Sequence, residues 1–219
     1  MQGHRVARGG GGLVLALGVL FAIGAPASAQ DAFEKLRDTT QLTETAPPAY
    51  RARFDTSQGP FVIEVHREWA PLAADRFYNL VKNGFYDETR FFRVVSGFVA
   101  QFGLHAEPSV QARWQTARMK DEPVVQSNTR GRVSFTQESM PGTRFTMVFI
   151  NYADNSRLDK SGFAAFGEVV SGMDVVDTLY SGYGTDNTPD QRRILRQGNA
   201  YLLENYPMLD YVKTARIGE

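Results

Sequence analysis

The stretch that decides the fold occupies residues 91–103 and reads FFRVVSGFVAQFG. Two apolar segments flank the dipeptide Ser96-Gly97, which is typical of a turn, so the stretch predicts a pair of short strands. Within these segments lie one guanidinium group, on Arg93, and one side-chain amide, on Gln101. A charged group inside an apolar run lowers stability unless the protein uses it. Arg93 and Gln101 are therefore the first candidates for a functional site.

The rest of the chain also consists mostly of short strands. Phe61, Ile63 and Val65 fall on one face of a strand that follows the turn at residues 57–60, which predicts a β-hairpin. Many short strands with few helices predict a mostly β fold, and we expect a closed antiparallel barrel capped by helices, because closure removes exposed strand edges. Strands are expected at Arg51–Thr56, Pro60–His66, Phe91–Val95, Phe98–Gln101, Gly131–Phe135, Thr146–Asn151, Phe163–Val170 and Tyr211–Ile217.

Two helices are predicted ahead of the C-terminal region. Pro71 suits the first turn of an amphipathic helix, and Gly84 suits its end. A shorter helix is expected at Met173–Leu179. Residues Gly103–Pro123 show little clean periodicity, so we interpret them as a long loop.

An extra helical segment, residues 188–207, is predicted before the last strand. Thr188 and Pro189 are typical of an N-cap and a first helical residue, and the amphipathic pattern that follows is interrupted at Gly198. We expect this segment to cover the barrel rather than to mediate function.

The N-terminus has the features of a secretory signal peptide over residues 1–29. Basic residues precede an apolar run at residues 13–23, which ends near Ala27-Ser28-Ala29. The run is too short to span a bilayer, which takes about 20 residues. We expect cleavage and export, to a periplasm or outside the cell; the alternatives are a glycine-rich tail or an uncleaved anchor. Residues 30–49 are expected to form a flexible arm outside the core, and residues 50–219 a single domain.

Composition excludes several kinds of chemistry. The 219 residues include 24 Lys and Arg, 24 Asp and Glu, and no cysteine, which removes thiolate metal sites and cysteine nucleophiles. The chain has no G-x-S-x-G and no H-E-x-x-H motif. His66 and His105, the histidines beyond the predicted cleavage point, are interpreted as solvated or capping residues. We therefore expect no metal, no cofactor, no nucleic acid, no membrane insertion after cleavage, and a monomer.

The stretch at residues 91–103 resembles the signature of the cyclophilin-type peptidyl-prolyl isomerases, F-H-R-x-I-x-G-F-x-x-Q-x-G. The resemblance continues through GRVSF at residues 131–135, FIN at residues 149–151 and the segment at residues 158–169. It covers about Ala52 to Leu179 and the last strand. It implies a cyclophilin-like barrel, proline-containing polypeptide substrates and prolyl isomerisation without a cofactor, here in an exported bacterial-type member.

The physics of this reaction favours arginine as the catalytic residue. The barrier to amide rotation, about 18–20 kcal/mol, comes from resonance between the nitrogen lone pair and the carbonyl. Twisting localises that lone pair, so a donor aimed at the nitrogen stabilises the transition state more than the planar amide. Together with the resemblance, this reasoning assigns catalysis to Arg93. The resemblance implies that Gln101 orients the arginine and the substrate carbonyl. By resemblance alone, substrate-binding roles fall to Phe98, Val99, Thr136, Gln137, Met147, Phe149, Leu158 and Phe163.

Several of these positions depart from the family pattern. Thr136-Gln137 stands where the family has Ala-Asn, and Arg157 where it often has tryptophan. Val99 and Phe163 stand where the family usually has methionine and often has histidine. Met147 replaces an expected glutamine and cannot donate a hydrogen bond. If this methionine only lacks a contact, Met147→Gln is expected to raise activity.

Two alternatives to an efficient isomerase follow from these departures. One is a cyclophilin-like module that binds proline-containing segments as a chaperone or assembly factor with little turnover. The other is an unrelated β-barrel that binds a small apolar ligand. The motif at residues 91–103 favours the enzyme, whereas Met147 and the altered loop at residues 136–143 favour the binding module.

Overall fold

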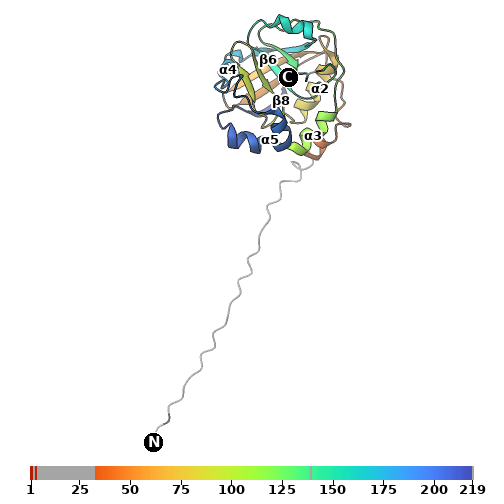
Figure 1. The fold of residues 1–219 in the computed structure, drawn as a ribbon. Coiled ribbons are helices and arrows are strands. Elements are labelled where there is room, and N and C mark those ends of the chain that lie inside the picture. The colour runs from red at the N-terminus through yellow and green to blue at the C-terminus, as the bar shows by residue number, and fades with distance from the viewer. Residues whose placement is uncertain (2, 4–32, 139, 219) are drawn as a thin grey trace.

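A computed structural model describes residues 1, 3, 33–138 and 140–218 of the chain. These residues form one curled, eight-stranded antiparallel sheet with helices packed around it (Figure 1). The strands follow one another across the sheet in the order β3-β4-β6-β5-β7-β2-β1-β8. The strands are β1 Ala49–Thr56, β2 Pro60–His66, β3 Arg93–Val95, β4 Val99–Phe102, β5 Arg132–Phe135, β6 Val148–Asn151, β7 Ala165–Ser171 and β8 Val212–Gly218. The helices are α2 Pro71–Lys82, α3 Pro108–Thr116, η1 Ser156–Ser161, α4 Met173–Asp177 and α5 Gln191–Asn205.

The two strands at the ends of this order, β3 and β8, do not pair with each other as strands in the described part of the chain. The residues just before β3 instead bond to the start of β8. The amide of Glu88 donates to the Val212 carbonyl at 2.8 Å, and the amide of Val212 donates to the Thr89 carbonyl at 2.9 Å. The mostly β, antiparallel fold is confirmed, whereas a barrel closed by strand pairing is not shown.

The main core lies between the sheet and α2. The predicted face of β2, consisting of Phe61, Ile63 and Val65, is buried as expected. Phe77 projects from α2 onto this core, and its ring centre lies 4.9 Å from that of Phe166 on β7. Aromatic burial of this kind supplies much of the stability of a small domain.

Helix α2 begins at Pro71 as predicted, but its N-terminal cap comes from another part of the chain. Ala70 at the N-cap position has no side chain that could bond the free amides. The carboxylate of Glu122 instead accepts hydrogen bonds from the amides of Leu72 at 2.6 Å and Ala73 at 2.9 Å. A carboxylate also interacts favourably with the positive end of the helix dipole.

The interpretation of residues 103–123 as a loop was wrong, because this segment contains α3. The helix starts at Pro108 and buries Val110, Gln111 and Trp114. His105 lies just before it and is buried rather than solvated. Its Nδ1 accepts a hydrogen bond from the amide of Glu107, the N-cap residue, at 3.0 Å. Burial lowers the pKa of His105 to about 4.

The expectation of an arm outside the core was wrong for residues 33–49. Leu36, Leu42 and Ala46 are buried against the domain. The indole nitrogen of Trp114 donates to the Leu36 carbonyl at 2.8 Å. The amide of Glu44 donates to the side chain of Asn79 at 3.1 Å, and that side chain returns a hydrogen bond to the Glu44 carbonyl. This segment therefore straps α2 and α3 together.

Helix α5 confirms the extra helical segment and its break. The cap is Asp190, whose side chain accepts from the amide of Arg192 at 2.9 Å, so the predicted cap at Thr188 lies two residues too early. Gly198 has non-helical angles, with φ of 57° and ψ of −145°. The helix lies beside α3 at one end of the domain (Figure 1).

The predicted signal peptide falls outside the described residues, except for residues 1 and 3, and stays a prediction. None of the helices within the described ranges is long and apolar enough to cross a membrane.

The buried histidine predicts a pH-dependent stability. Because the folded state holds the pKa of His105 at about 4 instead of 6.5, the unfolded chain binds more protons as the pH falls. Lowering the pH from about 7 to about 5 should therefore reduce the free energy of unfolding by about 2 kcal/mol. His105→Asn keeps an acceptor for the Glu107 amide and should remove this part of the pH dependence. Thermal unfolding of both proteins at the two pH values checks this, and identical pH slopes would contradict it.

Candidate active site

Eight of the ten residues singled out from the sequence line one small pocket of about 90 Å³. The pocket gathers side chains from β3, the turn between β3 and β4, β4, the loop after β5, β6, η1 and the turn that follows η1. The lining residues are Arg93, Phe98, Val99, Gln101, Thr136, Phe149, Leu158 and Phe163.

Strand pairing explains how three of these side chains meet. The turn at Ser96-Gly97 places Arg93 of β3 opposite Gln101 of β4, and the next pairing places Gln101 opposite Phe149 of β6. Residues directly opposite each other in an antiparallel pair project to the same face, with Cβ atoms about 4.5–5.5 Å apart. A cation, an amide and an aromatic ring therefore form one row across the sheet.

Arg93 and Gln101 form the polar side of the pocket. The Arg93 guanidinium donates to the side-chain oxygen of Gln101 at 3.5 Å and lies 5.5 Å from the centre of the Phe98 ring. Arg93 is half-buried, and burial lowers the pKa of its guanidinium from the usual value. Arginine nevertheless remains charged in proteins, because its pKa starts above 12.

The opposite side of the pocket is apolar. The rings of Phe149 and Phe163 meet edge to face, with centres 5.5 Å apart and planes at 78°. Leu158 completes this wall. A charged donor thus faces a small apolar cavity, which suits a ligand with a compact apolar ring beside a polar backbone.

Comparison with known proteins identifies the family. A family model described as cyclophilin type peptidyl-prolyl cis-trans isomerase/CLD matches residues 51–199. The chain belongs to the cyclophilin family. Similar proteins include a peptidyl-prolyl cis-trans isomerase of Acinetobacter baylyi, which is 38% identical over 146 residues, covering 62% of this chain and 77% of the relative. Peptidyl-prolyl cis-trans isomerase B of Escherichia coli is 34% identical over 134 residues, covering 58% and 81%.

Solved structures support the same fold. A crystal structure of a Cryptosporidium parvum cyclophilin type isomerase superposes with a TM-score of 0.60 at 21% identity, covering 78% of this chain and 98% of that chain. The family match and its named relatives show that this cyclophilin is a peptidyl-prolyl cis-trans isomerase.

Two residues assigned to the site by resemblance do not line the pocket of this cyclophilin. Gln137 turns to η1, where its side-chain amide donates to the Ser161 carbonyl at 3.0 Å. Met147 is only 3% exposed and packs in a second apolar cluster with residues of α5. Its sulfur lies 4.0 Å from the side-chain nitrogen of Gln101, so Met147 contacts a residue of the site without lining the pocket.

Two further arginines flank the pocket. Arg157 lies 4.9 Å from the centre of the Phe98 ring. Arg144, which sequence reasoning missed, is 5.8 Å from the centre of the Phe163 ring, pairs with Asp121 and donates to the Gly162 carbonyl. Burial lowers the pKa of Arg144. No local pattern marks this arginine, because its partners come from two distant loops.

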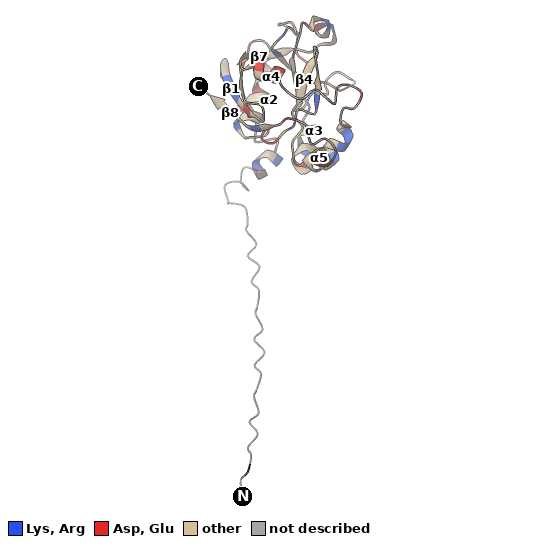
Figure 2. Cartoon of the chain, turned by 90° about the vertical axis from the view of Figure 1, so that its left-hand side faces the viewer, with Lys and Arg blue, Asp and Glu red and all other residues tan. Residues whose placement is uncertain are grey.

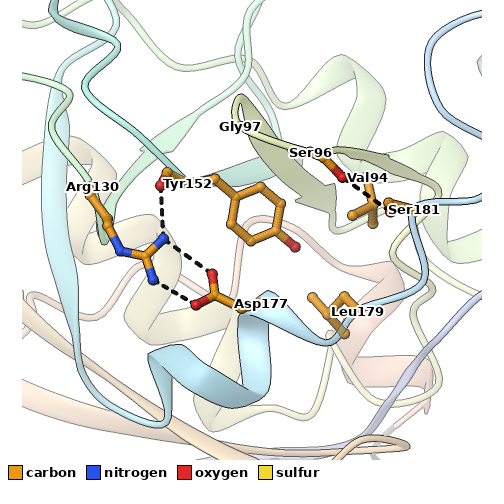
Figure 3. Close-up of a pocket in the computed structure, with 8 residues that line it drawn as sticks. All are labelled: Val94, Ser96, Gly97, Arg130, Tyr152, Asp177, Leu179 and Ser181. Carbon is orange, nitrogen blue, oxygen red and sulfur yellow. Dashed lines mark hydrogen bonds and ion pairs between the residues drawn. The ribbon is translucent and has the colours of Figure 1, made fainter.

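Figure 3 shows a second hollow, of about 270 Å³, lined in part by Val94 of β3. Because side chains alternate along a strand, Val94 points to the face opposite that of its neighbour Arg93. The polar groups of this hollow already bond to one another. Arg130 pairs with both carboxylate oxygens of Asp177 at 2.6 and 3.1 Å, and the hydroxyls of Ser96 and Ser181 lie 3.2 Å apart. This hollow offers no free donor comparable to Arg93.

The position of Met147 changes the expectation for its replacement by glutamine. Met147→Gln would place an amide whose oxygen can accept from the Gln101 side-chain nitrogen but whose own nitrogen lies among the apolar side chains of the cluster, and a buried polar group without a partner destabilises proteins by about 1–3 kcal/mol. We predict a lower melting temperature and no gain in kcat/KM for prolyl isomerisation. Met147→Leu, which preserves the apolar volume, should leave both close to wild type. A higher kcat/KM in Met147→Gln would contradict this interpretation.

Proposed function

We propose that Arg93 accelerates isomerisation by stabilising the twisted prolyl amide, and that the protein does this for exported polypeptides. The reaction forms and breaks no covalent bond; it only rotates the X-Pro amide about its C–N bond. Uncatalysed rotation takes tens of seconds or longer at room temperature.

The observation that carries the proposal is the position of Arg93 between a fixed amide and an apolar cavity. Gln101 accepts one hydrogen bond from the guanidinium and thereby restricts its orientation. A guanidinium has five N–H donors, so others remain for the substrate. A donor aimed at the prolyl nitrogen interacts with the lone pair only after rotation has localised it, and such selective interaction lowers the barrier.

The apolar wall gives the substrate ring its place. In the proposed complex the proline ring lies against Phe149, Phe163 and Leu158, and this contact holds the amide beside Arg93. Among the described residues, the side-chain nitrogen of Gln101 has the Met147 sulfur as its one partner, and sulfur is a weak acceptor. A substrate carbonyl would be a stronger acceptor for this nitrogen.

Two sequence features support export. Residues 1–29 have the order of basic residues, apolar run and small-residue cleavage site that secretory signals share. The chain also has no cysteine, so an oxidising compartment poses no risk of unwanted disulfides.

A second candidate function is binding of proline-containing segments with slow turnover. The positions of Gln137 and Met147 favour it, because neither side chain supplies a donor to the pocket. Losing one well-placed hydrogen bond costs about 1–3 kcal/mol, or up to about a hundredfold in rate.

Replacement of Arg93 tests the catalytic proposal. Arg93→Ala should lower kcat/KM on a short X-Pro peptide by about a hundredfold, which is typical of removing one preorganised donor. Because the side chain is only half-buried, the circular dichroism spectrum and melting temperature should stay near wild type.

Two further variants sharpen this test. Arg93→Lys keeps the charge but loses the planar fork, so it should restore little of the activity. Arg113→Ala removes an exposed arginine from α3 and serves as the control. An unchanged rate in folded Arg93→Ala would reject the role of Arg93.

Export has its own test. The full chain, expressed in a bacterium with a periplasm, should yield an exported protein whose N-terminus lies near Gln30 by mass spectrometry. Recovery of the uncleaved chain from the cytoplasm would reject this part of the proposal.

A further inference from the structure

Helix α5 and its flanking loops contact the hairpin that carries the catalytic row. This segment lies between α4 and β8, and the family match ends at residue 199, inside α5. The hairpin, residues 91–103, holds both Arg93 and Gln101. Contacts between these two segments occur where the chain enters and leaves the hairpin, at Phe92 and at the turn.

Beside the break in α5, Asn199 donates hydrogen bonds to the chain just before and just after the hairpin. The backbone amide of Asn199 donates to the Ala106 carbonyl at 3.0 Å, and its side-chain amide donates to the Glu88 carbonyl at 2.8 Å. Ala106 follows the hairpin and Glu88 precedes it. Only glycine fits at residue 198, because a Cβ there would lie 2.0 Å from the Ala106 oxygen.

Next to the hairpin, α5 packs in what we name the α5 cluster. Ile194 of α5 is 1% exposed in this cluster, as is Phe92, the residue next to Arg93. Met147 belongs to the same cluster and touches Gln101 through its sulfur. The buried members are Phe92, Leu104, Phe145, Met147, Ile194, Tyr201, Leu202 and Leu209.

At the turn, the loop before α5 makes a third contact. The hydroxyl of Ser181 lies 3.2 Å from that of Ser96, which belongs to the turn between β3 and β4 (Figure 3). Helix α5 and the loop before it therefore contact the chain on both sides of the hairpin, share a cluster with Phe92 and reach the turn at Ser96. Helix α5 itself is held in place against α3 at the periphery of the domain (Figure 2).

We propose that α5 is a clamp that positions Arg93 and Gln101, and that Asn199, Ile194 and Met147 are positioning residues for isomerisation. The inference rests on the proposed role of Arg93. Phe149, Phe163 and Leu158 lie outside the hairpin, whereas Phe98 and Val99, which also line the pocket, belong to it. Loosening the clamp therefore misplaces the donor while most of the apolar wall stays in place, and the effect falls more on kcat than on KM.

The test compares matched variants of the full chain on a short X-Pro peptide. Asn199→Ala removes the hydrogen bond to Glu88, whereas Asn205→Ala removes a bond of 2.9 Å from α5 to its own carbonyl at Tyr201. Ile194→Val deletes one methyl group from the α5 cluster, and Ile63→Val deletes one from the main core, where Ile63 is equally inaccessible. We expect Asn199→Ala and Ile194→Val to lower kcat about fivefold with a smaller change in KM, because small misplacements of catalytic groups reduce rates strongly. The two controls should keep the kcat of the wild type.

A second comparison separates positioning from general loosening of the fold. In an Arg93→Ala background, Asn199→Ala should cause a clearly smaller loss than in the wild type, because one of the two groups that it positions is gone. An equal loss in both backgrounds would overturn the clamp, as would an unchanged kcat in Asn199→Ala and Ile194→Val. Failure of the proposed function is read separately, from an unchanged rate in Arg93→Ala alone.

Discussion

The pairing register of β3, β4 and β6 is the constraint on which the active site depends. A shift by one residue would turn Arg93 and Gln101 to the opposite face, because side chains alternate along a strand. The turn at Ser96-Gly97 fixes this register on one side, with Gly97 at a φ of 70° that glycine adopts without strain. The pairing of Gln101 with Phe149 fixes it on the other side. The pairing of the strands therefore determines the row of cation, amide and ring.

A charged row next to an apolar core lowers stability unless it is held and partly satisfied. Arg93 remains only half-buried and gains one acceptor from Gln101, while Gln101 is 5% exposed and has a thioether as its second partner. Such a weak partner leaves the amide nitrogen available, since sulfur accepts hydrogen bonds poorly. The site therefore retains unused donors on both residues. That combination favours a ligand that brings its own acceptors, as a peptide backbone does.

Much of this arrangement is predictable from the sequence because it depends on local patterns. The alternation at Phe61, Ile63 and Val65 and the position of Pro71 each reflect contacts made within a few residues. Helix α3 escaped prediction because its buried face combines Val110, Gln111 and Trp114, and a buried glutamine interrupts the apolar pattern. The strap at residues 33–49 escaped because Leu36, Leu42 and Ala46 follow no helix or strand period. The pocket residues on the paired strands were brought together as expected, whereas Gln137 and Met147 point to partners that lie elsewhere in the fold.

Met147 shows why a family position cannot be interpreted apart from its surroundings. A methionine where glutamine is expected suggests a lost donor when the strand is considered alone. In the folded chain it is an apolar member of a cluster to which α5 contributes Ile194, Tyr201 and Leu202, and a glutamine there would leave an amide among these side chains. The methionine and the added helix therefore belong together: the pocket lacks a donor at the residue just before β6, and the hairpin that carries Arg93 gains support from α5. A catalytic group that is rigidly placed needs fewer neighbouring donors, because less free energy is needed to orient it in the transition state.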